Sequence, residues 1–245
     1  MNRYKIEIEY DGTPFVGWQY QNNGLSVQKV LQDAIFLFSQ EKVVVNGAGR
    51  TDAGVHAIEQ VAHFDSKKKF DNKKFVSGVN KHIGNKPVSI LDIKKVNNKF
   101  HSRYNAKLRI YRYIIINRSS RLALQKNKAW HIKKKLDLSL MKKASKILIG
   151  TNDFTSFRSS SCGAKSAIRT LKKAVIKKEG NKIFLDFTSK SFLQQQVRSM
   201  VGCLKFVGEG KWTKEKLKKV MILKKRSGCA PPAPSQGLYL LKIKY

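Results

Sequence analysis

The chain has 245 residues, of which 41% are hydrophobic and 27% are charged. This composition fits one large or two ordinary folded domains and excludes a wholly disordered chain. Fifty lysines and arginines stand against 16 acidic residues, so the formal net charge is +34. Such an excess attracts polyanions, nucleic acid first among them, although tracts such as residues 67–69 and 133–135 are also typical of solvated lysine-rich surfaces.

The three cysteines, Cys162, Cys203 and Cys229, are widely separated and show no metal-ligand spacing. They favour a reducing cytosol over a disulfide framework or a zinc site. The first residues lack the apolar run of a signal peptide, and no segment is apolar for long enough to span a bilayer. We therefore expect a soluble, cytoplasmic protein.

The first half of the chain predicts two helices among four strands, in the order β-α-β-β-α-β. Tyr4, Ile6, Ile8 and Tyr10 alternate with polar residues as in a half-buried strand, and Ser26 is placed to cap the helix that follows. The predicted elements are a strand at 4–10, a helix at 27–38, strands at 42–47 and 59–65, a helix at 71–82 and a strand at 88–96.

The second half predicts the same order with one additional helix. Its predicted elements are a strand at 109–117, a helix from Leu138 that ends at Gly150, strands at 168–177 and 182–189, helices at 192–207 and 214–223, and a strand at 238–244. The sequence thus predicts an α+β protein of two tandem ferredoxin-like or RRM-like domains, residues 1–105 and 106–245. We expect their antiparallel sheets to form a central basic cleft.

The most distinctive segment is the glycine-rich stretch 47–56, which lies between two apolar strand-like runs. A charged side chain on such a flexible, glycine-rich backbone is typical of a group that contacts a ligand. The alternative interpretation is a hairpin turn that carries an Arg–Asp ion pair at the surface. A carboxylate acts as nucleophile or general base only while ionised, and a guanidinium such as that of Arg50 favours that form. Asp52 is therefore the candidate reactive group.

Further candidates lie near the middle of the chain and on the helix predicted at 192–207. Arg198 is expected to face a carboxylate or a phosphate, or else to lie at the surface of an amphipathic helix. Tyr111 and Tyr113 share a strand face and alternate with arginines, an arrangement that suits base stacking as well as core packing. His101 and Arg103 belong to another polar and aromatic cluster just upstream.

Several segments, in order along the chain, resemble the bacterial tRNA pseudouridine synthase A family. They are YDGTPFVGWQ (10–19), SVQ (26–28), GRTDAGVH (49–56), FHSR (100–103), YRY (111–113), NDFTSFR (152–158), VRSMVG (197–202) and GLYL (237–240). The resemblance implies a homodimer of two-domain α/β subunits that isomerises uridines at positions 38, 39 and 40 in the anticodon stem-loop of tRNA. It implies no metal and no cofactor.

The resemblance also assigns roles to single residues. Asp52 falls on the catalytic aspartate of the family, Tyr111 on its active-site tyrosine, and Arg50 and Arg198 on arginines of the same site. Beside Tyr111 we assign Arg103 and His101 to substrate binding.

Three other interpretations stay open at this point. A non-catalytic basic RNA-binding protein explains the charge and the tyrosines but not a carboxylate in the most permissive loop. A metal-dependent nuclease that uses Asp52, His56 and Asp65 predicts inhibition by chelators and strand scission, although the histidines show no metal-ligand pattern. A basic ribosome-associated protein accounts for the charge alone.

Overall fold

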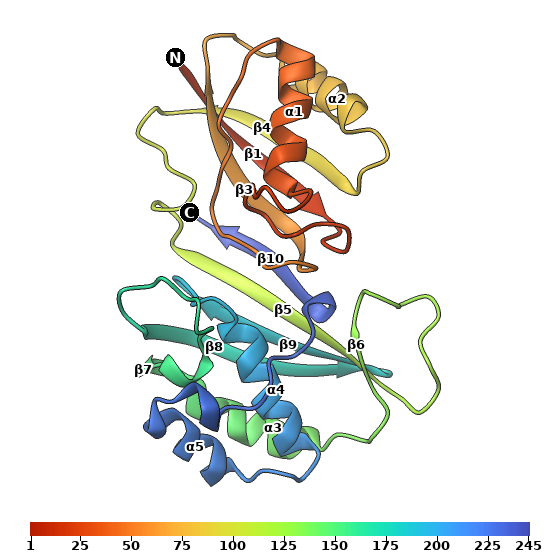
Figure 1. Ribbon diagram of the computed structural model, residues 1–245, viewed down its shortest axis with the longest axis vertical. Coiled ribbons are helices and arrows are strands. Elements are labelled where there is room, and N and C mark those ends of the chain that lie inside the picture. The colour runs from red at the N-terminus through yellow and green to blue at the C-terminus, as the bar shows by residue number, and fades with distance from the viewer. The chain divides into compact units, whose positions relative to one another are not determined.

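The computed structural model describes all 245 residues, from Met1 to Tyr245, with ten strands and five α-helices. Figure 1 shows the α+β architecture that the sequence predicts. The chain forms two compact units: unit 1 comprises residues 1–107 and 239–245, and unit 2 comprises residues 108–238. The closing strand therefore belongs to unit 1, although the sequence prediction placed it in the second domain. None of the helices combines the length and the apolarity that a bilayer crossing requires.

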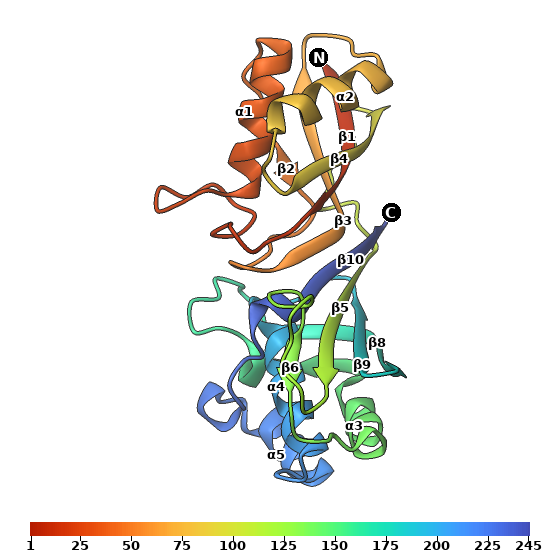
Figure 2. The same ribbon diagram turned by 90° about the vertical axis from the view of Figure 1, so that its right-hand side faces the viewer.

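Unit 1 is a sheet covered on one face by two helices (Figure 2). Its elements are β1 (Asn2–Tyr10), α1 (Val27–Ser39), β2 (Asn46–Gly47), β3 (His56–Ser66), α2 (Asn72–Ile83), β4 (Val88–Val96) and β10 (Leu238–Lys244). Strand β1 pairs antiparallel with both β3 and β4. Strand β3 also pairs antiparallel with β2 and in parallel with β10. The apolar positions of β1 are all buried in the core of the unit, as the alternation predicts.

Residues 42–45 do not form the strand that their valines predict. The N–H of Val45 donates to Gln32 Oε1 at 3.1 Å, and Gln28 Nε2 donates to the carbonyl of Val45 at 2.9 Å. Two glutamines of α1 thus make the hydrogen bonds to the Val45 backbone that a neighbouring strand would otherwise make. Val43 and Val45 are buried all the same, so the apolar pattern reports burial here and not sheet pairing.

The strands of unit 2 also carry their helices on one face (Figure 1). Its elements are β5 (Leu108–Asn117), β6 (Trp130–Ile132), α3 (Leu138–Ser145), β7 (Gly150–Asp153), β8 (Ile168–Glu179), β9 (Lys182–Ser189), α4 (Gln196–Gly208) and α5 (Lys214–Leu223). Strands β5, β9, β8 and β7 are adjacent in that order and antiparallel, and β6 pairs in parallel with β5. The sequence prediction did not include the short strands β6 and β7.

Helix α4 begins four residues later than the apolar pattern predicts. Gln195 has a left-handed backbone with φ of 61°, which interrupts the helix on its N-terminal side. The side chain of Gln196 then turns back, and its Oε1 accepts the N–H of Leu193 at 2.8 Å. Arg198 is in consequence a first-turn residue of α4.

Candidate active site

Asp52 lies in the Asp52 loop, residues 47–56, which connects β2 to β3 in unit 1. The segment that follows β1 packs directly on this loop. Gly17 forms an antiparallel bridge with Asp52, and the N–H of Trp18 donates to the carbonyl of Thr51 at 3.1 Å. The hydroxyl of Tyr10 lies 2.8 Å from Thr51 Oγ1 in a buried hydrogen bond. The two sequence blocks 10–19 and 49–56 are therefore one structural feature.

Glycines allow these two segments to approach so closely. A Cβ on Gly12 would lie 2.0 Å from the carbonyl oxygen of Val55, and one on Gly17 would lie 2.7 Å from that of Thr51. Gly17 also has φ of +123°, where a side chain would be strained. Gly12 and Gly17 thus serve close backbone contacts inside unit 1.

The other side of the Asp52 loop is held from β3 and from Trp18. Gln60, which is fully buried, donates from Nε2 to the carbonyl of Gly49 at 2.8 Å. The ring of Trp18 covers Gly47, whose Cβ, if present, would lie 2.5 Å from it. Asp52 itself remains half-buried and Arg50 is exposed. The loop therefore carries a partly accessible carboxylate on a backbone that is fixed on both sides.

His56 braces the end of the Asp52 loop. Its Nδ1 lies 2.9 Å from Asp11 Oδ1 and 3.0 Å from the N–H of Gly12, and its ring stacks on Tyr239 at 4.6 Å. Burial, with the nearby charge of Asp11, raises the pKa of Tyr239 to about 12. Sequence reasoning considered His56 only as a metal ligand and missed this role. The pairing of β1 with β3 could have indicated this contact, because it sets Tyr10 opposite Ala57 and so brings His56 close to the end of β1.

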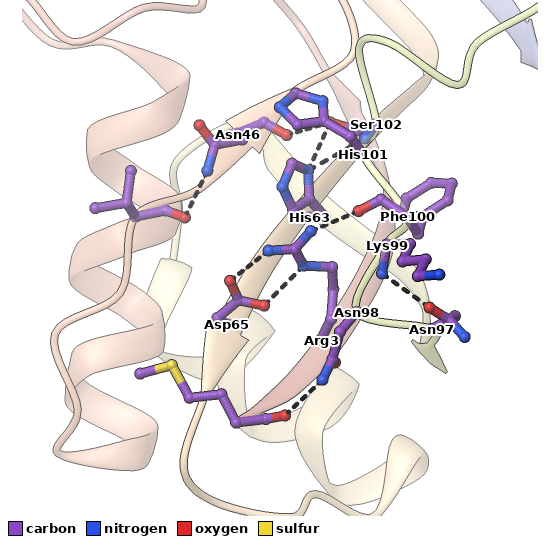
Figure 3. A network of polar contacts seen from close by, with 12 residues as sticks. Arg3, Asn46, His63, Asp65, Asn97, Asn98, Lys99, Phe100, His101 and Ser102 are labelled. Carbon is purple, nitrogen blue, oxygen red and sulfur yellow. Dashed lines mark hydrogen bonds and ion pairs between the residues drawn. The ribbon is translucent and has the colours of Figure 1, made fainter.

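Loop 97–107, which carries the FHSR block, is anchored to β1 and β3 by Arg3 (Figure 3). Arg3 holds Asp65 with two hydrogen bonds, Nε to Oδ1 at 2.8 Å and Nη2 to Oδ2 at 2.6 Å, and donates from Nη1 to the carbonyl of Phe100 at 2.8 Å. The bond to Arg3 holds the pKa of Asp65 below its usual value. Asp65, a metal ligand in the nuclease interpretation, is thus engaged in a structural ion pair.

Ser102 fixes the same loop to a buried histidine. Its N–H donates to His63 Nδ1 at 3.2 Å, and its hydroxyl lies 2.8 Å from that nitrogen and 2.7 Å from the carbonyl of Asn46 (Figure 3). Burial, with the positive charges of His101 and Arg3, lowers the pKa of His63 to about 4. His63 is therefore neutral at physiological pH and accepts the hydrogen bond that positions Ser102.

The tip of loop 97–107 presents His101, Arg103 and Tyr104. Nδ1 of His101 accepts the N–H of Arg103 at 3.1 Å, and its ring lies 4.3 Å from that of Tyr104. The guanidinium of Arg103 lies 5.9 Å from the Tyr104 ring, and Tyr104 is 73% exposed. A guanidinium beside an exposed aromatic ring suits contact with a phosphate and a base. Tyr104 is a candidate that sequence reasoning missed, although it directly follows the FHSR block.

The two tyrosines of β5 differ in their surroundings. Tyr111 is 8% exposed and meets the ring of Phe192 edge-on at 5.2 Å. Tyr113 is fully buried and donates its hydroxyl to the carbonyl of Pro234 at 2.7 Å, and burial raises its pKa. Arg112, between them, forms two 2.8 Å bonds to Asp186. Core packing therefore accounts for Tyr113, and an ion pair accounts for Arg112.

Arg198 is half-buried in the first turn of α4 and contacts the backbone of Ala233 twice. Its Nε donates to the carbonyl of Ala233 at 2.7 Å, and the N–H of Ala233 donates to the carbonyl of Arg198 at 3.0 Å. The sequence predicted a carboxylate or phosphate partner, or a surface position. Within unit 2, a backbone carbonyl accepts the Nε–H of the guanidinium.

Of the six predicted site residues, Arg50, Asp52, His101 and Arg103 belong to unit 1, while Tyr111 and Arg198 belong to unit 2. Within unit 1, His101 and Arg103 share the tip of loop 97–107.

The sequence profile of a family described as tRNA pseudouridine synthase matches residues 6–105 and 144–245. Relatives named tRNA pseudouridine synthase A align over their entire length and the entire length of this chain. The protein of Pelagibacter ubique is 56% identical over 246 residues, and those of Afipia carboxidovorans and Parvibaculum lavamentivorans are each 45% identical over 245 residues.

The chain belongs to the tRNA pseudouridine synthase family. This confirms the resemblance that the sequence blocks indicate. The matched residues of this family member include the Asp52 loop, loop 97–107 up to residue 105, and α4 with Arg198. Tyr111 lies outside the residues that the profile matches and inside the full-length alignment with the relatives.

Proposed function

We propose that this chain isomerises uridine to pseudouridine in tRNA and that Asp52 is its reactive group. Family membership over the whole length supports the reaction. The placing of a partly accessible carboxylate on a loop held by Tyr10, Gly12 and Gln60 supports the choice of Asp52. As the resemblance implies, the uridines at positions 38, 39 and 40 of the anticodon stem-loop are the proposed targets.

The chemistry requires the bond from C1′ to N1 of uracil to break and a bond from C1′ to C5 to form. The C5 proton leaves, N1 gains a proton, and all other atoms stay in the substrate. Ionised Asp52 serves either as a nucleophile or as the base that assists glycosidic cleavage. The uridine must first leave the stacked helix, as it does in other enzymes that act on a base.

Three further residues receive roles in this proposal. Tyr111 stacks on the uracil, and its hydroxyl assists removal of the C5 proton. Arg198, whose Nε is held by the carbonyl of Ala233, is assigned to contact the substrate. Arg50, two residues before Asp52 and exposed, keeps positive potential at the loop.

Loop 97–107 is the proposed RNA contact of unit 1. His101 orders the tip through its bond from Arg103, and Arg103 with Tyr104 meets a phosphate and a base. The net charge of +34 supports polyanion binding in general and is the basis for the predicted basic cleft.

The finer points of assembly belong to the same proposal. Each unit is assigned to the ferredoxin-like type, on the strength of the order β4-β1-β3-β2 in unit 1 and the antiparallel sheet with helices on one face in unit 2. A homodimer is proposed from the family resemblance, and the cytoplasm is proposed as the place where tRNA is met.

Tritium release tests the proposed reaction. A tRNA transcript carrying tritium at uridine C5 is incubated with the wild type, with Asp52→Asn and with Asp33→Asn, an exposed carboxylate on α1. The wild type and Asp33→Asn release tritium, and Asp52→Asn releases none while it still binds the tRNA. Binding without release by the folded wild type would favour the RNA-binding interpretation. Strand scission that stops on addition of a chelator would favour the nuclease.

A further inference from the structure

A short segment of unit 2, residues 229–234, lies along α4 and is called the strap here. At its far end Ala233 exchanges two hydrogen bonds with Arg198. In the middle of the strap, the carbonyl of Pro231 packs against Gly202 of α4: a Cβ on Gly202 would lie 2.1 Å from that oxygen. The hydroxyl of Tyr113 donates to the carbonyl of Pro234, the last residue of the strap. The strap is thus seated directly on the helix that carries Arg198.

Two thiols face each other where the strap begins. Sγ of Cys203, on α4, lies 3.4 Å from Sγ of Cys229, and both are free thiols. The length of a disulfide bond is about 2.05 Å, so the two sulfurs need to approach by only about 1.3 Å. Cys203 is fully buried and Cys229 is half-buried, so a reagent reaches Cys229 first.

The two thiols differ in their surroundings and therefore in their reactivity. Arg226 donates from Nη1 to the carbonyl of Ala230, which places its guanidinium beside the start of the strap. The contact with Cys203 and the charge of Arg226 lower the pKa of Cys229. The same contact, together with burial, raises the pKa of Cys203. Cys229 is therefore the thiol that attacks, and Cys203 is the one that resolves.

We propose that Cys203 and Cys229 form a dithiol site that small-molecule disulfides oxidise reversibly to an internal disulfide, which fastens the strap to α4. The Cys229 thiolate attacks one sulfur of the reagent, breaks its S–S bond and releases one thiolate. The Cys203 thiol then gives up its proton, attacks Sγ of Cys229 and releases the second thiolate. Two protein thiols are oxidised, and one disulfide reagent is reduced to two thiols.

Oxidation acts on a segment that the proposed function uses. The strap supplies the carbonyl that holds Arg198, so fastening it limits the movement available to that arginine. This consequence rests on the proposed role of Arg198, while the thiol chemistry does not. In a reducing cytosol the pair stays reduced, and the disulfide is expected only under oxidising conditions.

The test incubates the reduced full-length protein with glutathione disulfide, then alkylates free thiols and maps tryptic peptides. We expect the number of free thiols to fall from three to one. Peptides 199–205 and 227–242 are expected to appear joined, with the sum of their masses less two hydrogens. Peptide 159–165, which carries Cys162, is expected to remain alkylated. Dithiothreitol is expected to restore all three thiols.

Matched variants separate this site from general thiol reactivity. Cys162→Ser is expected to leave formation of the joined peptides unchanged, and Cys229→Ser to abolish it. Cys203→Ser is expected to accumulate the mixed disulfide with glutathione on Cys229. Oxidation of Cys162 as fast as the pair, or a stable mixed disulfide on wild-type Cys229, overturns the proposal. Because these readouts involve no RNA, their failure is distinct from failure of the proposed function.

Discussion

Unit 1 contains two loops with proposed functions that are built in different ways. The Asp52 loop packs backbone against backbone, because Gly12 and Gly17 bring another segment within contact of its carbonyl groups, and the side chains of Tyr10 and Gln60 add hydrogen bonds. Loop 97–107 is held by the side chains of Arg3 and His63, which bond to its carbonyl of Phe100 and to Ser102. Its tip, with Arg103 and Tyr104, is exposed to solvent.

The difference matches what each loop has to do. A carboxylate that attacks or deprotonates must lie within a few tenths of an ångström of its target, since small displacements are costly in rate. Contact with a phosphate tolerates the reach of a long arginine side chain. Close backbone packing therefore suits the Asp52 loop, and an anchored base with an exposed tip suits loop 97–107.

The largest effect is expected from Gly12→Ala. The added methyl group meets the backbone carbonyl of Val55, so the Asp52 loop must shift and unit 1 loses about 3 kcal/mol of stability. Turnover is expected to fall by about a hundredfold or more, because Asp52 moves with the loop. Gly163→Ala, which has open space around it, is the control and leaves both unchanged. Normal tritium release by Gly12→Ala would mean that this backbone packing is irrelevant to the reaction.

Tyr10→Phe is a smaller change that also tests whether the contacts of the Asp52 loop matter for the reaction. It leaves the buried hydroxyl of Thr51 without its 2.8 Å partner and is expected to cost about 1–2 kcal/mol. We expect kcat to fall more than the affinity for tRNA, because the loss displaces the reactive loop and no RNA contact. The matched variant Tyr20→Phe alters an exposed ring and changes neither quantity. Chemical denaturation and tritium release are the two measurements.

Arg103→Ala tests the exposed tip of loop 97–107. Affinity for tRNA is expected to fall several-fold at low salt, and the slope of log affinity against log salt is expected to lessen by about 0.7–0.9, which corresponds to one phosphate contact. Turnover at saturating tRNA stays unchanged. Arg103→Lys keeps the charge and is expected to keep most of the slope. A drop in kcat without a change in slope would contradict the assignment to RNA contact.

The smallest effect concerns pH and the anchor of loop 97–107. His63 has a pKa of about 4 in the folded protein, against an ordinary value of about 6.5 in the unfolded chain. Between these values only the unfolded chain takes up the proton, so the free energy of unfolding decreases as pH falls from 6.5 to 4. His63→Gln is expected to flatten this decrease, whereas His82→Gln, on an exposed position of α2, is expected to retain it. An unchanged profile in His63→Gln would remove His63 from this role.

Much of the fold follows from apolar periodicity. The strands at 88–96, 182–189 and 238–244 and the helix at 214–223 have the predicted limits. The failures arise where contacts distant in sequence decide the outcome: glutamines of α1 satisfy residues 42–45, and the left-handed Gln195 delays α4. Strands β6 and β7 are too short to show a period of two.

The sequence predicted the residue types of the site better than the contacts that hold those residues in place. The composition of residues 47–56 indicates a special loop, yet nothing local reveals that Gly12 and Tyr10 hold it, since those contacts span about forty residues. The pattern of Tyr111 and Tyr113 does not distinguish them. The structure assigns Tyr113 to the core, because its side chain is fully buried and its hydroxyl donates to the carbonyl of Pro234.

The most direct test of the account is a single-turnover measurement with tRNA already bound to excess enzyme, which separates the chemical step from binding. Wild type, Asp52→Asn and Gly12→Ala are compared at equal occupancy. We predict no tritium release by Asp52→Asn and slowed release by Gly12→Ala, with every tRNA bound. Release by bound Asp52→Asn at the wild-type rate would contradict the claim that this carboxylate carries out the reaction.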